Sequence, residues 1–410
     1  MRRGTVVRFC SVLVGTLVLA AALPLGVPMA VAGSTPFAVD EDIIYALTPV
    51  GDEHFGSAVA LSGNTLVVGV PDHDEITGLL DDGIAHVYVR SGTDWVWQAS
   101  LHAPTLAAGD KFGTSVAIQG DTIVVGAPYR DGSHGESGAA YVFTRTGTTW
   151  SAAVPLGDEF AVAGDKMGQS VDIDGVTIAV GCPGRSSSEG AVRVYVWDGD
   201  EWNSGGGVFA EAPGGMPDDR LGGCVSLSGD TILASAGGFD HEIGSVVAFT
   251  RSGISWSFED RFYEPVSTVG EQFGGPIDLQ ADGYVAVIGS PTHDVGAEVD
   301  KGIAYVYARG ASGWELIDTL NNPSSNTAGG GDWFGSSVAF DGHNLILVGA
   351  FWDDDQTGAA YYFQLRDGEW VMAQKVTPPA DPCCALFGDS VALDGGRAMV
   401  GATLASTPLS

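Results

Sequence analysis

The feature that most constrains this chain is a repeat of about 55 residues that occurs seven times. Each copy begins with a large apolar residue followed by glycine, and successive copies start 57, 55, 54, 52, 61 and 53 residues apart. The starting residues are Phe55, Phe112, Met167, Leu221, Phe273, Phe334 and Phe387. A period of this length indicates similar units that stack on one another, because one unit cannot bury its own apolar faces. The 410 residues are therefore expected to form one repeat architecture.

Every copy has the same internal order, which the copy beginning at Phe112 illustrates. A short strand pattern at 115–118 leads through a polar turn to a second apolar strand, which ends in the corner Gly126-Ala127-Pro128. After a variable loop, residues 140–143 alternate aromatic and β-branched side chains, and a further strand opens at Trp150. Runs of this kind predict four short strands per copy, and the sixty glycines of the chain suit the many turns between them.

A sheet of four short antiparallel strands buries both of its faces only when neighbouring sheets stack on it. Seven such sheets around an axis bury one another, so the predicted fold is all-β: a seven-bladed β-propeller of four-stranded antiparallel blades over residues 33–410. The seventh copy holds only two strands, and residues 42–49 resemble the fourth strand at 97–104. This N-terminal strand is predicted to complete the last blade and close the ring. One outer strand of that blade is either missing or supplied by residues near Phe37.

The first 32 residues have the pattern of a secretory signal peptide. Arg2, Arg3 and Arg8 form a basic start, an uncharged apolar stretch follows, and Ala30-Val31-Ala32 offers a small-residue cleavage site. The alternative is an uncleaved membrane anchor, for which the apolar stretch is long enough. Two prolines near its end favour cleavage, and no later stretch is apolar enough to span a membrane. The mature chain is expected to be secreted, either extracellular or at the cell surface.

The strongly acidic balance of the chain narrows the range of partners. The net charge is −33, and loss of the three arginines in residues 1–32 would leave −36. A surface of this charge repels nucleic acid and anionic lipid, so no nucleic-acid partner is expected. Cations, basic groups and neutral glycans remain compatible, and self-repulsion that keeps the protein soluble is the simplest interpretation.

Four cysteines lie outside the predicted signal peptide, and export permits them to form disulfides. Cys182, Cys224, Cys383 and Cys384 allow three pairings, among which the sequence does not choose. Cys182 and Cys224 stand where other copies have small residues, which favours free buried thiols at these two positions.

The repeats resemble the FG-GAP repeat family, which is known from the propeller of integrin α-chains and from bacterial exported proteins. The name-giving residues are Phe112-Gly113 and Gly126-Ala127-Pro128, and their equivalents recur over about residues 42–402. The resemblance implies a seven-bladed propeller with a binding or adhesion role and no defined reaction. The leg domains, membrane span and cytoplasmic tail of integrins have no counterpart here, so a receptor role does not follow.

Calcium is a point at which this chain departs from the family. Integrin-type repeats often carry an Asp-x-Asp-x-Asp-Gly loop between the first two strands, whereas this chain has short turns such as Ser62-Gly63-Asn64. Such turns cannot supply the six or more oxygen ligands that calcium takes. The nearest approach is Asp172-Ile173-Asp174-Gly175, and no cofactor is predicted. Weak candidates for a metal site are four carboxylates in the variable loops, where a solvated acidic loop is the simpler interpretation: Asp72, Asp74, Asp353 and Asp355.

A carboxylate recurs two residues before the Phe-Gly position in six of the seven copies. These residues are Glu53, Asp110, Asp165, Asp219, Glu271 and Asp332, and Ala385 interrupts the series in the seventh copy. In a propeller the six would lie on one face around the axis. They either accept backbone N–H groups and fix the turns between blades, or form an acidic ring that binds a cation or a basic partner.

Catalytic motifs are missing from the sequence. It contains no Gly-x-Ser-x-Gly elbow, no His-Glu-x-x-His pair and no phosphate-binding loop, and its eight histidines are scattered. The preferred interpretation is a secreted, non-catalytic binding or adhesion module that recognises an extracellular protein or glycan through its loops. The alternatives are a propeller enzyme that acts on extracellular polysaccharide and a purely structural surface protein. Exposed aromatic residues on the loops would favour binding, and paired carboxylates or histidine near the axis would favour the enzyme.

Overall fold

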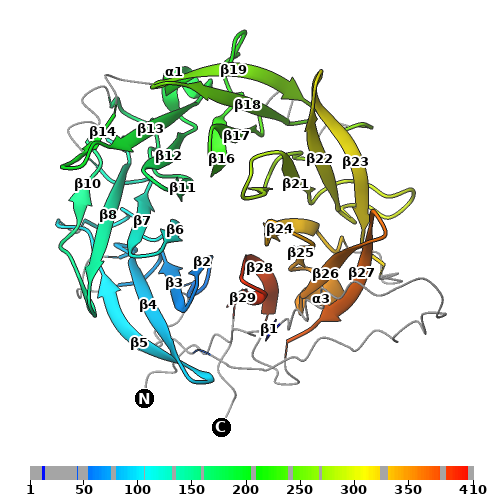
Figure 1. Cartoon of the computed structure of the whole chain (residues 1–410), viewed down its shortest axis with the longest axis horizontal. Coiled ribbons are helices and arrows are strands. Elements are labelled where there is room, and N and C mark those ends of the chain that lie inside the picture. The colour runs from blue at the N-terminus through cyan, green and yellow to red at the C-terminus, as the bar shows by residue number, and fades with distance from the viewer. Residues whose placement is uncertain are drawn as a thin grey trace, which may run out of the picture.

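The protein is an all-β propeller built from four-stranded antiparallel blades. The structure is a computed structural model that describes residues 12–13, 44, 54–74, 80–105, 107–131, 135–157, 161–204, 209–238, 243–266, 270–323, 331–378 and 385–404. These residues form seven sheets that stand side by side around a central axis (Figure 1). In each complete blade the strands follow the chain from the axis outwards, in the order that the repeat predicted.

The first three blades differ mainly at their outer edges. Blade 1 contains β2 (Ala58–Ser62), β3 (Thr65–Val70), β4 (Ile84–Ser91) and β5 (Asp94–Leu101). Blade 2 contains β6 (Ser115–Gln119), β7 (Thr122–Ala127), β8 (Ala139–Thr146), β9 (Thr149–Trp150) and β10 (Val154–Pro155). Blade 3 contains β11 (Val171–Asp174), β12 (Thr177–Cys182), β13 (Ala191–Trp197), β14 (Trp202–Asn203) and β15 (Phe209–Ala210). In blades 2 and 3 the outer strand is split into two short pieces, both of which pair with the third strand.

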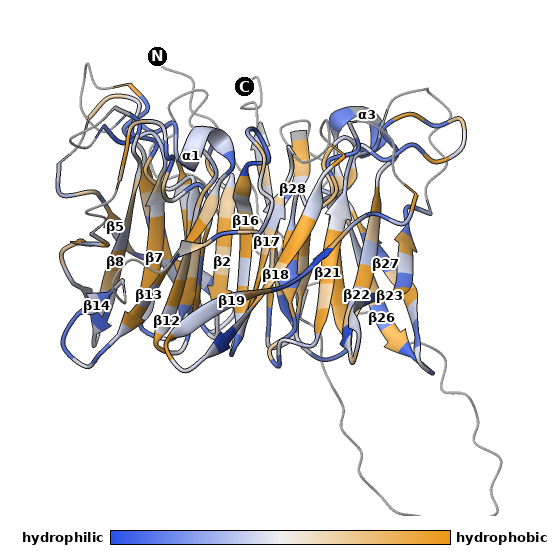
Figure 2. Ribbon diagram, turned by 90° about the horizontal axis from the view of Figure 1, so that it is seen from above, coloured by the Kyte–Doolittle hydropathy of each residue, from blue (hydrophilic) through white to orange (hydrophobic). Residues whose placement is uncertain are grey.

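Blades 4 to 6 have four continuous strands each. Blade 4 contains β16 (Leu221–Ser228), β17 (Thr231–Ala236), β18 (Ser245–Ser252) and β19 (Ser255–Phe262). Blade 5 contains β20 (Ile277–Leu279), β21 (Val285–Ser290), β22 (Ile303–Gly310) and β23 (Gly313–Asn321). Blade 6 contains β24 (Phe334–Phe340), β25 (Leu345–Ala350), β26 (Ala359–Arg366) and β27 (Glu369–Val376). Two short helical turns, α1 (Arg185–Ser188) and α3 (Asp353–Gln356), lie in loops on one face of the ring (Figure 2).

Six blades are complete, where the sequence predicted seven. The seventh sheet consists of β28 (Ala385–Asp394) and β29 (Arg397–Leu404), with the two-residue β1 (Val12–Leu13) paired to β29. Two described strands follow blade 6 in the chain, and the third strand of this sheet, β1, comes from the N-terminal region. The strand predicted at 42–49 and the residues near Phe37 lie outside the described residues, except for Ile44. Ile44 is buried in a core cluster that includes Ala398 and Val400 of β29.

The seventh sheet lies between blade 6 and blade 1. Its innermost strand, β28, contacts both β24 and β2. The Ser390 hydroxyl donates a hydrogen bond to the Gly56 carbonyl of blade 1 at 2.7 Å. The same bond joins earlier pairs of blades, as from Ser115 to Gly168 at 2.9 Å. The contact between the last and the first sheet therefore repeats the contact between ordinary neighbours.

The Phe-Gly and Gly-Ala-Pro glycines meet across the boundary between blades. A Cβ added to Gly126, in the corner of blade 2, would lie 2.0 Å from the carbonyl oxygen of Gly168 in blade 3. Gly168 has a φ of +89°, a conformation that side chains rarely adopt. The Gly-Ala-Pro glycine of one blade and the Phe-Gly glycine of the next therefore form one close backbone contact, which leaves no room for a side chain at the corner.

The apolar cores lie between blades, as the aromatic rows predicted. One cluster joins Val67 and Val87 of blade 1 to Phe112, Val125 and Tyr141 of blade 2, and Phe112 is fully buried. The tryptophans that open the fourth strands are buried in blades 1, 2, 4 and 5: Trp95, Trp150, Trp256 and Trp314. The recurring aromatics are therefore part of the frame.

The structure bears on the predictions made for the cysteines and for membrane-spanning segments. Cys182 and Cys224 are free thiols, as their repeat positions predicted, whereas Cys383 and Cys384 lie outside the described residues. None of the helices in the described ranges is long and apolar enough to cross a membrane.

Candidate functional site

A channel runs along the axis and is lined by the innermost strand of all seven sheets. Its cavity volume is about 530 Å³. Small or polar residues occupy the matching lining position of each strand: Ala60, Ala117, Asp172, Ser226, Asp278, Ala339 and Ala392. We call the end of the channel beside α1 and α3 the upper mouth, and the end beside the turns between the first two strands of each blade the lower mouth (Figure 2).

The upper mouth is formed by the residue directly before each Phe-Gly position. All seven of these residues have positive φ angles, between 51° and 62°. They are His54, Lys111, Lys166, Arg220, Gln272, Trp333 and Leu386. The repeat thus brings one side chain per sheet to this end of the channel, and these side chains differ more from copy to copy than the frame does.

A pocket of about 620 Å³ opens at the upper mouth over blades 3 to 5. Lys166, Arg220 and Gln272 line it. Gln169 and Gly223 line both this pocket and the channel, so the two cavities are continuous. We call it the mouth pocket. Its lining contains two cations and a single carboxylate, which belongs to Asp218.

Lys166 and Arg220 have no carboxylate partner within the described part of the chain. The Lys166 ammonium lies 5.1 Å from the ring centre of Tyr129, and Arg220 is exposed. At least eight of the thirteen other described cations have a carboxylate partner, in pairs that include Arg145–Asp121, Arg185–Asp165, Arg251–Asp230, Arg309–Glu259, Lys301–Asp332 and Lys375–Asp353. Two uncompensated cations in one pocket of a protein with a net charge of −33 mark this pocket as the place for an anion.

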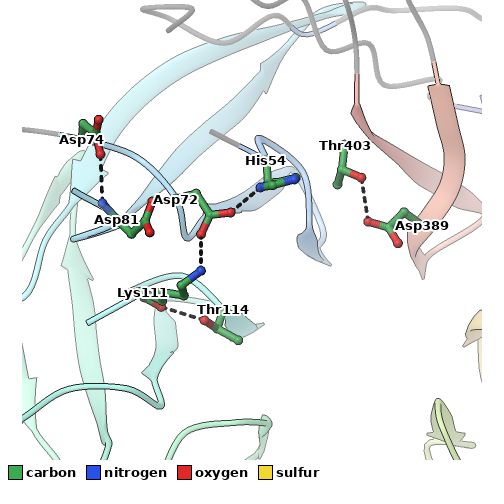
Figure 3. A network of polar contacts seen from close by, with 8 residues as sticks. All are labelled: His54, Asp72, Asp74, Asp81, Lys111, Thr114, Asp389 and Thr403. Atoms are coloured by element: carbon green, nitrogen blue, oxygen red, sulfur yellow. Dashed lines mark hydrogen bonds and ion pairs between the residues drawn. The ribbon is translucent and has the colours of Figure 1, made fainter. Parts of the chain in front are cut away.

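The blade 1 side of the upper mouth is neutralised by an aspartate. Asp72 accepts hydrogen bonds from His54 and from the Lys111 ammonium, the latter at 2.8 Å (Figure 3). Burial acts to raise the pKa of Asp72, but the two bonds outweigh it and hold that pKa below its usual range. Asp72 is therefore ionised and compensates Lys111, so the free positive charge of the mouth is concentrated at blades 3 and 4.

Aromatic side chains gather in the blade 6 sector of the upper face. Trp333 stacks on Trp352, with ring centres 5.5 Å apart and planes 19° apart, and both contact Phe351. Trp352 is 38 % exposed. This arrangement provides the exposed loop aromatics that the sequence analysis associated with binding.

The predicted acidic ring is buried in the turns between blades. Its described members are at most 3 % exposed: Asp110, Asp165, Asp219, Glu271 and Asp332. Asp165 and Asp219 accept the backbone N–H groups of Val162 and Met216, each at 3.0 Å. Glu53 lies outside the described residues. A ligand role for these carboxylates stays a prediction, and the hydrogen bonds favour the alternative in which they fix the turns.

The weak metal candidates do not come together in one cluster. Asp74 accepts the N–H of Asp81 at 2.9 Å and fastens its own loop, as Asp131 and Asp294 do in other blades (Figure 3). Asp72 is paired as described above. Asp353 is buried, accepts a hydrogen bond from the Tyr361 hydroxyl and pairs with Lys375 at 2.9 Å. Asp355 lies in α3, and its side chain lies outside what the structure describes.

A group that the sequence analysis did not assemble lies between blades 4 and 5. Glu264, Glu271 and His293 bring their ligand atoms within 4.8 Å of one another. Glu264 and His293 were not singled out, because their spacing matches no known motif. Superposing the repeats would have drawn attention to this position, where the copies carry Ala103, Asp158, Ala212, Glu264, Asn322 and Pro378.

The lower mouth is built from side chains that bond to the next blade. Asp174 accepts the N–H of Gly229 at 2.7 Å, and Ser62 accepts that of Gly120 at 3.0 Å. Deeper in the channel, Asp172 accepts the N–H of Leu227 at 2.7 Å. The two carboxylates of the nearest approach to a calcium loop therefore link blade 3 to blade 4.

The fold and the channel define the class of protein as a β-propeller with four-stranded blades. FG-GAP repeats are matched in three parts of the chain: the family model described as FG-GAP repeat covers residues 41–88, 95–143 and 325–363. Among solved structures, the chain is similar to the periplasmic gluconolactonase PpgL of Pseudomonas aeruginosa. That similarity has a TM-score of 0.54 at 13 % identity and covers 91 % of this chain and 96 % of the other, so it concerns the fold alone. A search of curated proteins finds no match.

Proposed function

We propose that the protein is a secreted binding module whose mouth pocket holds an extracellular glycan that carries carboxylate or sulfate groups. The observation that carries this proposal is the pair of uncompensated cations, Lys166 and Arg220, in one pocket at the upper mouth. Variable side chains on a rigid scaffold are where binding specificity usually lies. Because the protein as a whole is strongly acidic, a pocket with two unpaired cations is the region to which an anionic ligand would be attracted.

The side chains of the upper mouth suit such a ligand. A guanidinium binds a carboxylate or sulfate through two parallel hydrogen bonds, and an ammonium adds a point charge. Gln272 offers an amide to ligand hydroxyl groups. Trp333 and Trp352 offer broad apolar faces to sugar rings.

The carboxylate content of the mouth pocket itself favours binding over glycan cleavage, whereas the channel below it is lined by Asp172, Asp278 and Asp389, the carboxylates near the axis that would suit an enzyme. Glycoside hydrolysis generally needs two carboxyl groups that flank the scissile bond. Asp218 is the single carboxylate in the lining of the mouth pocket. The remote negative charges weaken the attraction, but over distances beyond about 8 Å they are screened at physiological ionic strength.

The test is equilibrium binding of four probes to the purified protein: an oligogalacturonate, a sulfated oligosaccharide, a neutral oligosaccharide of equal length and a polyglutamate peptide. An acidic glycan is expected to bind, the neutral glycan is not, and affinity should fall as salt rises. The double variant Lys166→Gln/Arg220→Gln should weaken binding at least ~30-fold, because each lost charge-assisted contact contributes roughly 1–1.5 kcal/mol. The control is Arg366→Gln, at the exposed lower end of β26.

Three outcomes would overturn the proposal. They are equal binding by the double variant, preference for polyglutamate over both acidic glycans, and absence of binding to either acidic glycan. Turnover of a bound glycan, or of gluconolactone, would replace the binding role with an enzymatic one.

We also infer that the N-terminal segment completes a seventh blade after residues 1–32 are removed. The burial of Ile44 against the seventh sheet and the start of the family match at residue 41 support this assignment. β1, which lies within the predicted signal peptide, pairs with the edge of β29 that a third strand would take. Sequencing of the secreted chain should give Gly33 as its first residue. A chain that starts at residue 51 should melt well below one that starts at 33, and equal melting would contradict the assignment.

A further inference from the structure

The boundary between blades 4 and 5 contains a buried group of metal-binding side chains. Glu264 follows β19 by two residues, Glu271 lies in the link to β20, and His293 lies in the loop after β21. The His293 Nδ1 atom is 3.0 Å from Glu264 Oε1 and 3.3 Å from Glu271 Oε1. The Glu264 side chain is fully buried, that of Glu271 is 4 % exposed and that of His293 is 13 % exposed.

We propose that Glu264, Glu271 and His293 Nδ1 bind a divalent transition-metal ion of the zinc type, which joins the outer strand of blade 4 to blade 5. Carboxylate and imidazole ligands bind zinc at about 2.0–2.2 Å, which places neighbouring ligands of a tetrahedral site about 3.3 Å apart. The two measured separations match that spacing. An imidazole among the ligands favours a transition metal over calcium or magnesium, which take oxygen ligands.

Glu264 supplies an independent sign that a cation belongs here. Its Oε2 atom is buried and accepts no well-formed hydrogen bond. Among the described residues, no lysine or arginine pairs with Glu264. Two buried carboxylates at this separation repel each other, and a divalent cation offsets that repulsion.

The equivalent positions in other blades show that this arrangement is particular to one boundary. Asp165, Asp219 and Asp332 hold the place of Glu271, and their cations are Arg185, Arg261 and Lys301. The place of Glu264 is held by Ala103, Ala212 and Asn322 in blades 1, 3 and 5, and by Asp158 and Pro378 in blades 2 and 6. Asn322 donates a hydrogen bond to Asp332 at 2.8 Å. The place of His293 is held by Arg130 and Arg185 in blades 2 and 3 and by His73 in blade 1. Among the described residues, the combination of two carboxylates with an imidazole occurs at the boundary between blades 4 and 5.

Neighbouring groups hold the ligands in place. The Tyr305 hydroxyl donates to Glu264 Oε1 at 2.9 Å and orients that carboxylate. The His293 backbone is fixed by its N–H bond to the Ser290 carbonyl and by the bond that its own carbonyl accepts from the Gly302 N–H. Outer partners of this kind are a regular part of metal sites, and their removal typically lowers metal affinity 10- to 100-fold.

The experiment uses the full chain, freed of metal with EDTA and titrated with Zn²⁺ in the presence of excess Ca²⁺. Calcium occupies the exposed carboxylate loops and leaves the imidazole-containing site to zinc. One tightly bound zinc per chain is expected, with a rise in melting temperature. Cobalt substitution should give visible absorption bands of low-symmetry, nitrogen-containing coordination.

Two ligand variants, one outer variant and one control separate metal binding from simple destabilisation. His293→Ala and Glu264→Gln should each lower zinc affinity at least 100-fold and abolish the zinc-induced rise in melting temperature. Tyr305→Phe should lower affinity by ~10-fold while the fold is kept. His343→Ala, on an exposed turn of blade 6, should bind zinc as the wild type does. Equal zinc affinity of the wild type and His293→Ala, or loss of all zinc to calcium, would overturn the proposal.

Discussion

The same repeat forms both mouths of the channel, but the side chains at the lower mouth bond to neighbouring blades, whereas those of blades 3 to 5 at the upper mouth line a pocket. At the lower mouth, the last residue of each innermost strand often bonds to the backbone of the next blade, as Asp174 does to Gly229. At the upper mouth, Lys166 and Arg220 form no ion pair in the described ranges and face a pocket of about 620 Å³. The comparison teaches that the described carboxylates of the lower mouth belong to the frame, whereas the unpaired cations of the upper mouth face a pocket, and the proposed binding role rests on that difference.

The largest effect should follow from breaking the frame that both mouths share. Gly126→Ala would place a Cβ 2.0 Å from the Gly168 carbonyl oxygen, and backbone atoms cannot yield as a flexible side chain does. Forcing atoms into a packed boundary costs about 3 kcal/mol or more, so thermal melting should show a large loss of stability. The control is Gly157→Ala, where the added Cβ meets nothing within 4 Å. Equal melting of the two variants would show that the glycine contact between blades is unimportant.

The next effect separates the lower mouth from ligand binding. Asp174→Ala removes the acceptor of the Gly229 N–H bond and of the Gln119 amide bond, at 2.7 and 2.9 Å. Stability should fall by about 1–2 kcal/mol in urea unfolding, because these donors lose their partner. The affinity for an acidic glycan should be unchanged. A gain or loss of affinity beyond threefold would mean that the two ends are not independent.

A smaller effect is expected from the aromatic sector of the upper mouth. Trp352→Ala removes an exposed ring that stacks on Trp333, so glycan affinity should fall about 5- to 10-fold, equivalent to about 1 kcal/mol. Because Trp352 is 38 % exposed, the melting temperature should move little. An acidic ligand without sugar rings should bind this variant as it binds the wild type, and a matching loss for both ligands would contradict the stacking role.

The smallest expected effect is a pH dependence of stability caused by Asp172 and Asp278, two aspartates that line the channel. Burial raises the pKa of Asp172 and of Asp278 to about 7, so the folded chain holds protons that the unfolded chain releases near pH 4. Stability from these groups is therefore present at low pH and is lost as pH rises from about 4 to about 7. The double variant Asp172→Asn/Asp278→Asn should flatten the melting curve against pH by about 2–4 °C over that window. An unchanged slope would mean that the two carboxyl groups are ionised throughout.

Most of the frame could be predicted from the sequence because it recurs. Seven copies of the signature, five with Phe-Gly and four with a Gly-x-Pro corner, together with aromatic third strands, indicated the blades, their strand order and the cores between them. The count of complete blades could not be read in this way. The third strand of the last sheet is β1, whose pairing with β29 joins residues far apart in the sequence.

The site was less predictable, because it depends on which side chains are left without a partner. Asp165 and Lys166 are adjacent in the sequence, yet one is buried against Arg185 and the other lines the mouth pocket. The regular carboxylates drew attention through their recurrence. The hydrogen bonds of Asp165 and Asp219 favour a structural role, and a ligand role for the series stays a prediction. Lys166 and Arg220, the side chains proposed to bind the ligand, have no counterparts that recur in every copy. The repeat therefore predicts where they lie but not what they do.

The most direct test of the account is affinity labelling of the lysines. The chain has four lysines, of which Lys111, Lys301 and Lys375 are held in ion pairs with Asp72, Asp332 and Asp353. An oligogalacturonate activated as an ester should acylate Lys166 at the upper mouth, and excess unactivated ligand should suppress that labelling in peptide mapping. Labelling spread over the other lysines, or labelling of Lys166 that free ligand does not reduce, would contradict the account.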